Sequence, residues 1–514
     1  MALRQQLSVL GGRVGRTTLL RPAAVAASSR RPRKERPALS IHSRNFHPSG
    51  KKEILPVIGG ALAVAAVATG LRYLIRAGER MQEMEAEGKA GGRAGSPEGP
   101  ENGGAERGNV GPTDGPAFGI DVGVTNLRLA FSDSAEKRPE IVENREGSRW
   151  TPAALAFKDM TDPVIGALAR AQRYEAAGTT LVGMQPLLGL QFAEPSWGDV
   201  ASSSGATGGG VFEGGGGFVG LGVGGEGGAV LTAEEAVGLM LGNIKSLGEH
   251  KVASGGGAVL SCPGYFTDTQ RDAIAGAGER AGIAVLDVIE EPVAAVLAAR
   301  EMSLLPKEGS RGLVAVLDVG GRTTQCSIVD TAVDDGTLPK LVGSDWTMEC
   351  GGDQMDAVVV DSLDTEFKRN NGGMSLKGDM MALTSRLYDA ATAARIELSR
   401  AQQAYVNLPY ITADQTGPKH LDVAMSRARM DILLEPLLKK AEVPCGNALS
   451  LAGVDVSALS AVLVIGGCCR TPAIQDLARR VFMEGGAGIV SPEQSEEMIV
   501  LGTALEARKL MFES

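Results

Sequence analysis

The sequence predicts an α/β fold of two similar lobes, and three strand-to-glycine turns predict it. Apolar strands end in Asp-x-Gly at Asp121 and again at Asp318, and each turn is followed by a second apolar strand. A third apolar strand, residues 461–465, ends in Gly466-Gly467. Such turns aim backbone N–H groups into one concavity that can hold an anion. An Asp-x-Gly turn taken alone is commoner in ordinary hairpins, but three together favour two lobes facing across a nucleotide.

The first fifty residues hold ten basic residues and one acid, Glu35. An Arg- and Ser-rich, acid-poor start is typical of organelle transit peptides, and Arg44-Asn45-Phe46 suits a mitochondrial processing site. We therefore expect residues 1–50 to be a mitochondrial transit peptide. A disordered basic tail is the structural alternative, and a chloroplast or endoplasmic reticulum membrane is the alternative location.

Residues 54–71 carry no charge, and Arg72, Tyr73 and Arg76 follow them. At about 1.5 Å per residue a helix over this stretch spans roughly 27 Å, which is enough for a bilayer core. We therefore expect a single-pass anchor over residues 54–75, in the mitochondrial inner membrane. A merely embedded or cleaved segment is the alternative, and nearly balanced basic residues on the two sides leave the orientation open.

Residues 76–115 are rich in Gly, Glu, Arg, Pro and Asn and hold few large apolar residues. This composition predicts a flexible linker, because it cannot bury enough apolar surface to fold. The linker would let the domain that follows, residues 116–514, stand off the membrane.

The whole chain has 514 residues, 43% of them hydrophobic, and a formal net charge of -10. It is long enough to bury a large core, and its acidity excludes a general nucleic-acid binder. The six cysteines show no metal-ligand spacing. Cys468-Cys469 could be redox-active, but small core or loop residues are the commoner case, and a reducing compartment is the default.

Within residues 116–514, Thr232 and Thr267 each precede an acid or amide three residues on, the pattern of a capping box that opens a helix. Residues 202–228 are instead almost pure glycine with scattered Val and Phe. Glycine loses the most entropy on ordering, so this insert predicts a flexible surface loop. A partner-binding insert is the alternative.

Six segments follow one another in a fixed order along residues 117–511. They are Gly119-Ile120-Asp121-Val122-Gly123 with Thr125-Asn126, Ser261-Cys262-Pro263-Gly264-Tyr265-Phe266 with Gln270-Arg271, Ile289-Glu290-Glu291-Pro292-Val293-Ala294-Ala295, Asp318-Val319-Gly320-Gly321, Gly351-Gly352-Asp353 and Val464-Ile465-Gly466-Gly467. In motif, order and spacing this region resembles the ATPase domain of the 70-kDa heat-shock protein chaperones. That resemblance implies a two-lobed actin-like ATPase fold with duplicated ribonuclease-H-like lobes.

The resemblance implies lobe boundaries as well. Lobe I would take about residues 116–300 with a C-terminal helix over 493–511, and lobe II about residues 312–490. The apolar interdomain linker and peptide-binding domain of the family have no counterpart in this sequence, so we expect no intrinsic peptide-binding domain.

The resemblance also implies Mg-ATP between the lobes. Asp121 and Asp318 would hold Mg²⁺ through its waters, because this small cation keeps much of its hydration. Glu291 stands where the family orders water and metal, and it joins the two aspartates as a catalytic residue. Pro263 and Arg271 match a pair that relays nucleotide state between lobes. The implied nucleotide-binding residues are Gly123, Thr125, Asn126, Gly320, Gly321, Thr323, Gly351, Gly352, Arg395, Ser399, Gly466, Gly467 and Arg470.

Several catalytic positions depart from the family pattern. Gln185 stands where a lysine contacts the reacting phosphate, and Gln325 stands where an aspartate joins the metal and water network. An amide lacks the charge that stabilises a transferring phosphoryl group, a contribution of about 3 to 4 kcal/mol. Arg322 replaces a hairpin glycine and could act as a substitute cation. The other departures are Val124 for a threonine, Ile396 for an arginine that stacks on adenine, and Thr392 for a glutamate that holds the ribose.

These departures leave two hypotheses open. The first is a membrane-tethered, chaperone-like domain that binds Mg-ATP, hydrolyses it slowly or not at all, and acts through co-chaperones or membrane-complex proteins in folding, import or assembly. The second is a non-catalytic scaffold subunit built on the actin-like fold. A sugar or acetate kinase of the same superfamily is disfavoured, because the segment from Pro263 to Arg271 matches chaperones.

Overall fold

The computed structural model describes residues 115–158, 163–173, 176–194, 197–204, 210–224, 229–305, 312–332, 337–378 and 386–513. The predicted transit peptide and transmembrane anchor, and the predicted linker up to residue 114, lie outside the described residues. Along the described ranges, no helix is both long and apolar enough to cross a bilayer.

The first Asp-x-Gly hairpin forms the centre of a six-stranded sheet. β1 (Ala117–Val122) pairs antiparallel with β2 (Asn126–Ser132) and parallel with β11 (Ala258–Cys262). Beyond β11, β12 (Val285–Glu290) adds a second parallel pair. Two short strands that pair antiparallel with β2 complete the sheet, β3 (Glu140–Ile141) and β4 (Thr151–Pro152). We call the part of the fold around this sheet lobe I.

The second hairpin forms the centre of a five-stranded sheet with the same pairing order. β13 (Leu313–Val319) pairs antiparallel with β14 (Thr324–Asp330) and parallel with β18 (Leu459–Ile465), and β19 (Gly488–Val490) lies parallel beyond β18. β15 (Lys340–Thr347) pairs antiparallel with β14. We call this part lobe II. The predicted mixed α/β fold is confirmed, and the repeated strand order is that expected of an actin-like ATPase.

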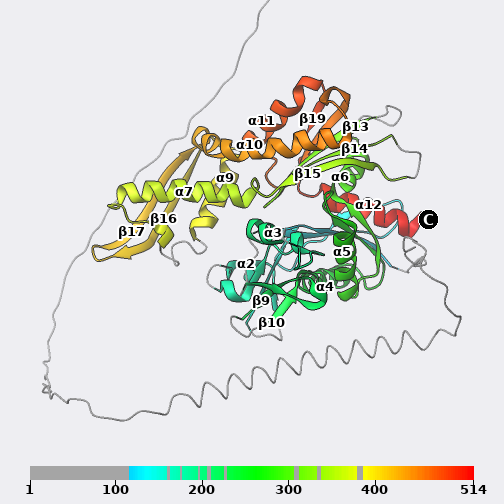
Figure 1. The fold of residues 1–514 in the computed structure, drawn as a ribbon, viewed down its shortest axis with the longest axis horizontal. Coiled ribbons are helices and arrows are strands. Elements are labelled where there is room, and N and C mark those ends of the chain that lie inside the picture. Colours follow the sequence, from blue (N-terminus) through cyan, green and yellow to red (C-terminus); the bar gives the residue numbers. More distant parts are fainter. Residues whose placement is uncertain are drawn as a thin grey trace, which may run out of the picture. The chain divides into compact units, whose positions relative to one another are not determined.

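Lobe I is covered by the C-terminal helix and by helices from the middle of the chain (Figure 1). α12 (Met498–Phe512) packs on β1 and on α6 (Glu291–Glu301). Glycine permits this close contact: a Cβ on Gly502 would lie 1.7 Å from the Ala294 carbonyl oxygen. The other two large helices are α4 (Ala233–Lys251) and α5 (Asp268–Arg280), and both open with the predicted capping boxes.

Lobe II places its largest helix on the sheet, since α10 (Arg427–Ala452) packs against β14 and β15 (Figure 1). α7 (Gly352–Asn370) packs against α9 (Tyr388–Leu398). The remaining elements are the long hairpin of β16 (Gln403–Asp414) and β17 (Gly417–Ser426), and α11 (Pro472–Phe482). Buried side chains such as Phe367 and Phe482 belong to one core cluster that runs through these helices.

The outer part of lobe I contradicts one expectation. The glycine-rich insert, residues 202–228, was expected to be a flexible loop, yet it contains β8 (Val211–Glu213) and β9 (Val219–Val223). β9 lies between β8 and β10 (Ala229–Thr232) and pairs with both. Val219, Leu221 and Val223 are each only 1% exposed. Burial of these alternating apolar side chains against the lobe I core offsets the entropy lost by the glycines between them.

Smaller elements complete the described chain. In lobe I they are β5 (Ala154–Phe157), β6 (Pro163–Ile165), α2 (Ala167–Ala171), η1 (Ala177–Thr179), β7 (Thr180–Val182), η2 (Gln185–Leu187), α3 (Trp197–Ser204) and η3 (Gly215–Gly217). In lobe II they are η4 (Leu376–Gly378), η6 (Val456–Ala458) and η7 (Met483–Gly485).

Candidate functional site

The first hairpin holds Asp121 near the carboxyl end of β1, with the aspartate only 3% exposed. Its Oδ1 accepts a hydrogen bond from the Ser261 hydroxyl at 3.3 Å, and its Oδ2 lies 3.2 Å from a guanidinium nitrogen of Arg128. A Cβ on Gly123 would lie 2.6 Å from the Asn126 carbonyl oxygen, so this turn requires glycine. The aspartate is therefore fixed in a tight, polar turn.

The second hairpin holds Asp318 at the matching place in β13. The turn is closed by the Gly320 N–H, which donates to the Thr323 carbonyl oxygen at 2.9 Å. Gly466 packs directly against the aspartate with a φ of 90°, and a Cβ there would lie 2.3 Å from Asp318 Oδ1. That oxygen is buried and has no hydrogen-bond partner among the described residues. The third glycine turn thus meets the second at the predicted carboxylate.

The two hairpins come from different lobes and touch at their tips. A Cβ on Gly321 would lie 2.5 Å from both Oγ1 and Cγ2 of Thr125. Gly351 and Gly352 join them, because the Gly352 N–H donates to the Gly320 carbonyl oxygen at 3.1 Å. The structure therefore brings together the glycine turns that the sequence assigned to one site.

Three carboxylates share this site. Burial raises the pKa of Glu291 well above its ordinary value, and the charges of Asp318 and Asp121 add to the rise. Burial and the charge of Asp121 likewise raise the pKa of Asp318 to about 7. Burial also raises the pKa of Asp121, although Arg128 and Ser261 oppose that rise. The charge of Asp121 thus acts on both Glu291 and Asp318, and the charge of Asp318 acts on Glu291, as expected of neighbouring carboxylates.

Gln185, at the predicted lysine position, is buried against the first hairpin. Its Nε2 donates to the Val122 carbonyl oxygen at 2.9 Å, and the residue is 3% exposed. Its Oε1 is buried with no hydrogen-bond partner among the described residues. The amide therefore fills the lysine position and supplies no positive charge there.

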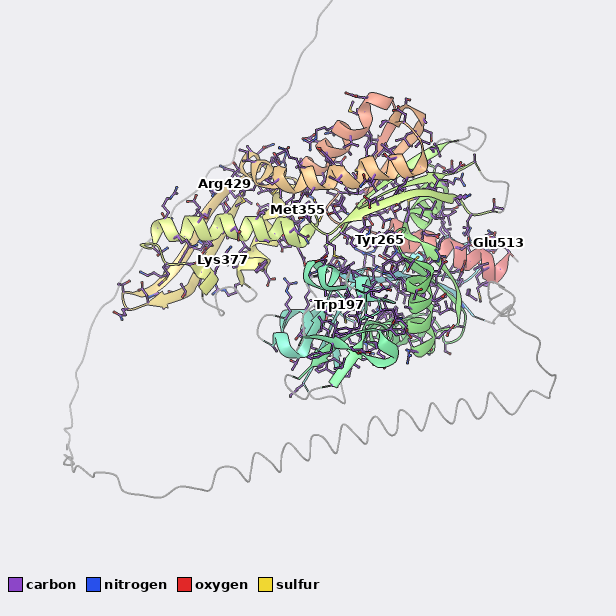
Figure 2. All side chains as sticks on the ribbon, in the orientation of Figure 1. Trp197, Tyr265, Met355, Lys377, Arg429 and Glu513 are labelled. Atoms are coloured by element: carbon purple, nitrogen blue, oxygen red, sulfur yellow. The ribbon has the colours of Figure 1, made fainter. Side chains whose placement is uncertain are left out.

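Gln325, at the predicted aspartate position, connects the lobes. Its Oε1 accepts from the Gly264 N–H at 3.3 Å, and its Nε2 donates to the Ser327 hydroxyl at 3.0 Å. Next to it, Tyr265 stacks on Trp346 with ring centroids 4.2 Å apart; Tyr265 is labelled in Figure 2. The amide thus serves as an interlobe contact.

The predicted relay pair lies at the same boundary. Pro263 precedes Gly264 and accepts a backbone hydrogen bond from Phe266 at 3.1 Å. Arg271 donates to the Val288 carbonyl oxygen at 2.6 Å and pairs with Glu290. Glu290 directly precedes Glu291, so the partner of Arg271 is the chain neighbour of one of the three site carboxylates.

The predicted adenosine residues make internal contacts. Arg395 is 7% exposed, and its Nε lies 2.6 Å from Asp356 Oδ1. The Thr392 hydroxyl donates to the other oxygen of Asp356 at 2.7 Å, and Ser399 donates to the Arg395 carbonyl oxygen at 3.2 Å. Ile396 is 56% exposed. In this arrangement the Arg395 guanidinium is already paired with a carboxylate.

Two further arginines are held by acids. Arg322 lies 2.8 Å from Asp353 at the start of α7. Arg470 lies 3.3 Å from Glu496 and donates to the Glu493 carbonyl oxygen at 3.0 Å. Arg322 is thus paired with an acid of lobe II, and its role as a substitute cation stays a prediction.

Arg128 is the site residue that sequence reasoning missed. It lies directly opposite Asp121 in the antiparallel pair of β1 and β2, and it also lies 3.4 Å from Glu496. The signal was present in the hairpin, because a three-residue turn at residues 123–125 fixes which residues face each other. Glu496, far away in sequence, carried no such signal.

The residues present do not fit a magnesium ion bound directly by both aspartates, and the expected binding through water stays a prediction. Both oxygens of Asp121 already have partners, Arg128 and Ser261. Among the residues that the structure describes, no three or more His, Cys, Asp or Glu side chains are grouped to hold a metal ion. Asp318, with its unpaired Oδ1, is the only one of the two predicted carboxylates that keeps a free oxygen.

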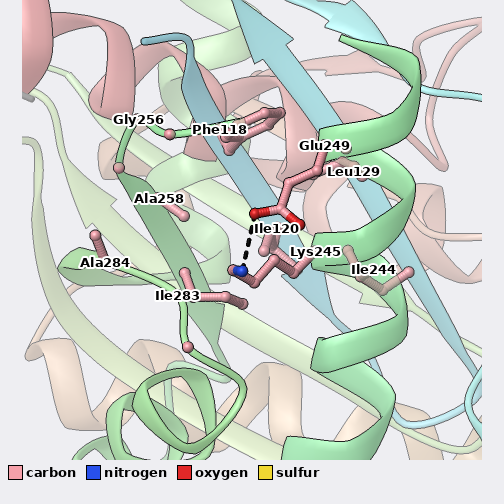
Figure 3. Close-up of a pocket in the computed structure, with 14 residues that line it drawn as sticks. Phe118, Ile120, Leu129, Ile244, Lys245, Glu249, Gly256, Ala258, Ile283 and Ala284 are labelled. Carbon is pink, nitrogen blue, oxygen red and sulfur yellow. Dashed lines mark ion pairs between the residues drawn. The ribbon is translucent and has the colours of Figure 1, made fainter. Parts of the chain in front are cut away.

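A separate cavity lies at the opposite end of β1 (Figure 3). It has a volume of about 280 Å³ and is lined by Phe118, Ile120 and Leu129, with Lys245 and Glu249 forming an ion pair at its side. Because it lies toward the amino end of the strand, it is not part of the hairpin site. All six cysteines are free and buried, Cys468 and Cys469 included, as expected of core residues.

The chain matches a model of a known protein family. The model of the family described as Hsp70 protein matches residues 117–511 of the 514. The match spans both hairpins, the segment from Pro263 to Arg271, and the Gly466-Gly467 turn.

Proposed function

Because this chain belongs to the Hsp70 protein family, we propose that it binds ATP or ADP between its two hairpins and hydrolyses ATP slowly or not at all. Members of the family are nucleotide-binding chaperones that generally bind ATP or ADP with Mg²⁺ and work with co-chaperones. The observation that carries the proposal is the contact of Gly321 with Thr125. It brings together two glycine turns from different lobes, each of a kind whose backbone N–H groups can bind phosphate.

Slow hydrolysis follows from the two glutamines. Gln185 has no positive charge to offer a transferring phosphoryl group, and Gln325 is engaged with Gly264 instead of carrying a carboxylate. Such charge stabilisation supplies about 3 to 4 kcal/mol in enzymes that have it. Nucleotide binding depends more on backbone N–H groups, which the hairpins retain.

The cellular setting belongs to the same proposal. The basic start of the chain and the uncharged stretch 54–71 support a mitochondrial, membrane-tethered domain on a flexible linker. Such a domain would act through partner proteins in folding, import or assembly, as members of the family work with co-chaperones.

A scaffold function is the second candidate, and the internal ion pairs favour it. Arg128, Arg395 and Arg470 each contact a carboxylate of this chain. The charges of these three arginines are therefore compensated within the chain. A scaffold would keep this arrangement and bind no nucleotide.

Nucleotide binding to the purified full chain separates the two candidates. Gly321→Ala pushes a Cβ against Thr125, so we expect ADP affinity to fall at least about tenfold. Gly446→Ala in α10 is the matched control, because nothing lies within 4 Å of a Cβ there. Equal binding by both variants would place the nucleotide elsewhere, and no binding by the unmodified chain would favour the scaffold.

A further inference from the structure

Arg128 occupies a repeated position of the fold. In lobe I it faces Asp121 across the hairpin, and in lobe II Gln325 faces Asp318 at the same register. The two hairpins therefore each place one side chain beside the site aspartate. In lobe I that side chain is a cation with only 10% of its surface exposed.

The guanidinium is held from two sides. One nitrogen lies 3.2 Å from Asp121 Oδ2, and the other lies 3.4 Å from Glu496 Oε2. Glu496 in turn lies 3.3 Å from Arg470, and a Cβ on Gly467 would lie 3.9 Å from the Glu496 side chain. Arg128 thus sits between the first hairpin and the segment that follows the third glycine turn.

The charge of Arg128 also acts on Asp318. Burial and Asp121 raise the pKa of Asp318, and Arg128 opposes that rise. A cation placed between two carboxylates and a phosphate site reduces their mutual repulsion, which is one role of a divalent metal ion there. A guanidinium can do the same, and its planar N–H groups also suit phosphate oxygens.

We propose that Arg128 is the resident cation of this site, so that the chain binds adenine nucleotides as tightly without Mg²⁺ as with it. The proposal rests on the proposed nucleotide binding and adds which cation the site uses. A magnesium ion bound directly to Asp121 would have to displace Arg128, and the guanidinium already compensates that carboxylate.

The experiment is calorimetric titration of the full chain with ADP, once in MgCl₂ and once in EDTA. For the unmodified chain the two dissociation constants should agree within about threefold, whereas Arg128→Met should bind at least about tenfold more weakly in EDTA than in MgCl₂. Arg149→Met is the matched control: it removes an arginine whose Nε lies 3.0 Å from Glu497 and whose side chain is 48% exposed. That variant should behave like the unmodified chain.

The outcomes separate this proposal from the one it rests on. If the unmodified chain binds ADP in MgCl₂ and loses tenfold or more in EDTA, the role of Arg128 is refuted while nucleotide binding stands. If it binds ADP in neither buffer, both proposals fail. Should Arg128→Met unfold in a thermal melt, Arg128→Lys decides: it keeps the charge, so it should stay metal-independent, and a Mg²⁺ requirement in it would count against the proposal.

Discussion

Replacing Gln185 by lysine should raise the rate of ATP hydrolysis. Gln185 is buried at the first hairpin, with its Nε2 2.9 Å from the Val122 carbonyl oxygen. Val122 lies between Asp121 and Gly123, so a longer side chain from residue 185 reaches the place where phosphates would meet the hairpin. The substitution adds the charge that the site lacks at this position.

The expected magnitude follows from charge and distance. A unit charge about 4 Å from a developing negative charge, at an effective dielectric of about 20, is worth about 4 kcal/mol. Measured losses of one such catalytic donor are about 3 kcal/mol, which is about a 100-fold change in rate. We therefore expect single-turnover hydrolysis by Gln185→Lys to be about 100-fold faster.

Folding should tolerate the change. Losing the hydrogen bond from Nε2 costs about 1 kcal/mol, but the substitution also removes Oε1, which is buried without a partner among the described residues. The carboxylates of the hairpins offset the cost of burying an ammonium group. A thermal melt of the variant should therefore lie close to that of the unmodified chain.

The assay is single-turnover hydrolysis of ATP by excess full chain in MgCl₂. Gln185→Leu is the control, because it removes the same amide without adding charge, and it should leave the slow rate unchanged. A Gln185→Lys variant that is folded, binds ATP and is no faster than Gln185→Leu would refute the reasoning, since charge at this position would then not limit the reaction.

Three further changes test the fold and the site. Gly502→Ala should lower the thermal midpoint, because its Cβ meets the Ala294 carbonyl oxygen at 1.7 Å; overpacking of this kind costs about 3 kcal/mol. Asp318→Asn should remove a pH dependence of stability. The pKa of Asp318 is about 7 in the folded chain and 3.8 ordinarily, so as pH rises the unfolded chain releases this proton first. The native chain should therefore lose about 1 kcal/mol of stability between pH 6 and pH 8, and the variant should not. Asp356→Asn should destabilise lobe II by about 3 kcal/mol in denaturant unfolding, because it leaves Arg395 buried without its carboxylate.

Each of these has a result that would contradict it. An unchanged melting point for Gly502→Ala would mean that α12 is not seated on α6 as described. Equal loss of stability from pH 6 to pH 8 in the unmodified chain and in Asp318→Asn would assign the titration to another group. Wild-type stability of Asp356→Asn would show that Arg395 reaches solvent.

Local motifs made much of the fold predictable. The hairpins around Asp121 and Asp318, and the capping boxes at Thr232 and Thr267, depend on residues close together in sequence, and the structure has all four. The glycine-rich insert was mispredicted because its glycine content was weighed above the alternation in residues 219–223. That period of two is a strand signal, and the buried valines and leucine show which effect is larger.

The ion pairs of the site were less accessible to sequence reasoning. Arg128 and Glu496 lie 368 residues apart, and their contact depends on how α12 and the segment before it pack on lobe I. Gln185 and Gln325 could be located as replaced residues, but their new partners, Val122 and Gly264, follow only from the packed backbone. Such pairings depend on tertiary packing and not on local sequence.

The central claim is most directly tested by mixing a trace of ATP with excess full chain and following both retention and hydrolysis of the bound nucleotide. The account predicts that ATP is retained and stays largely intact over the time in which an intact chaperone ATPase completes a turnover. Failure to retain ATP, or turnover as fast as that of the intact chaperone, would contradict it.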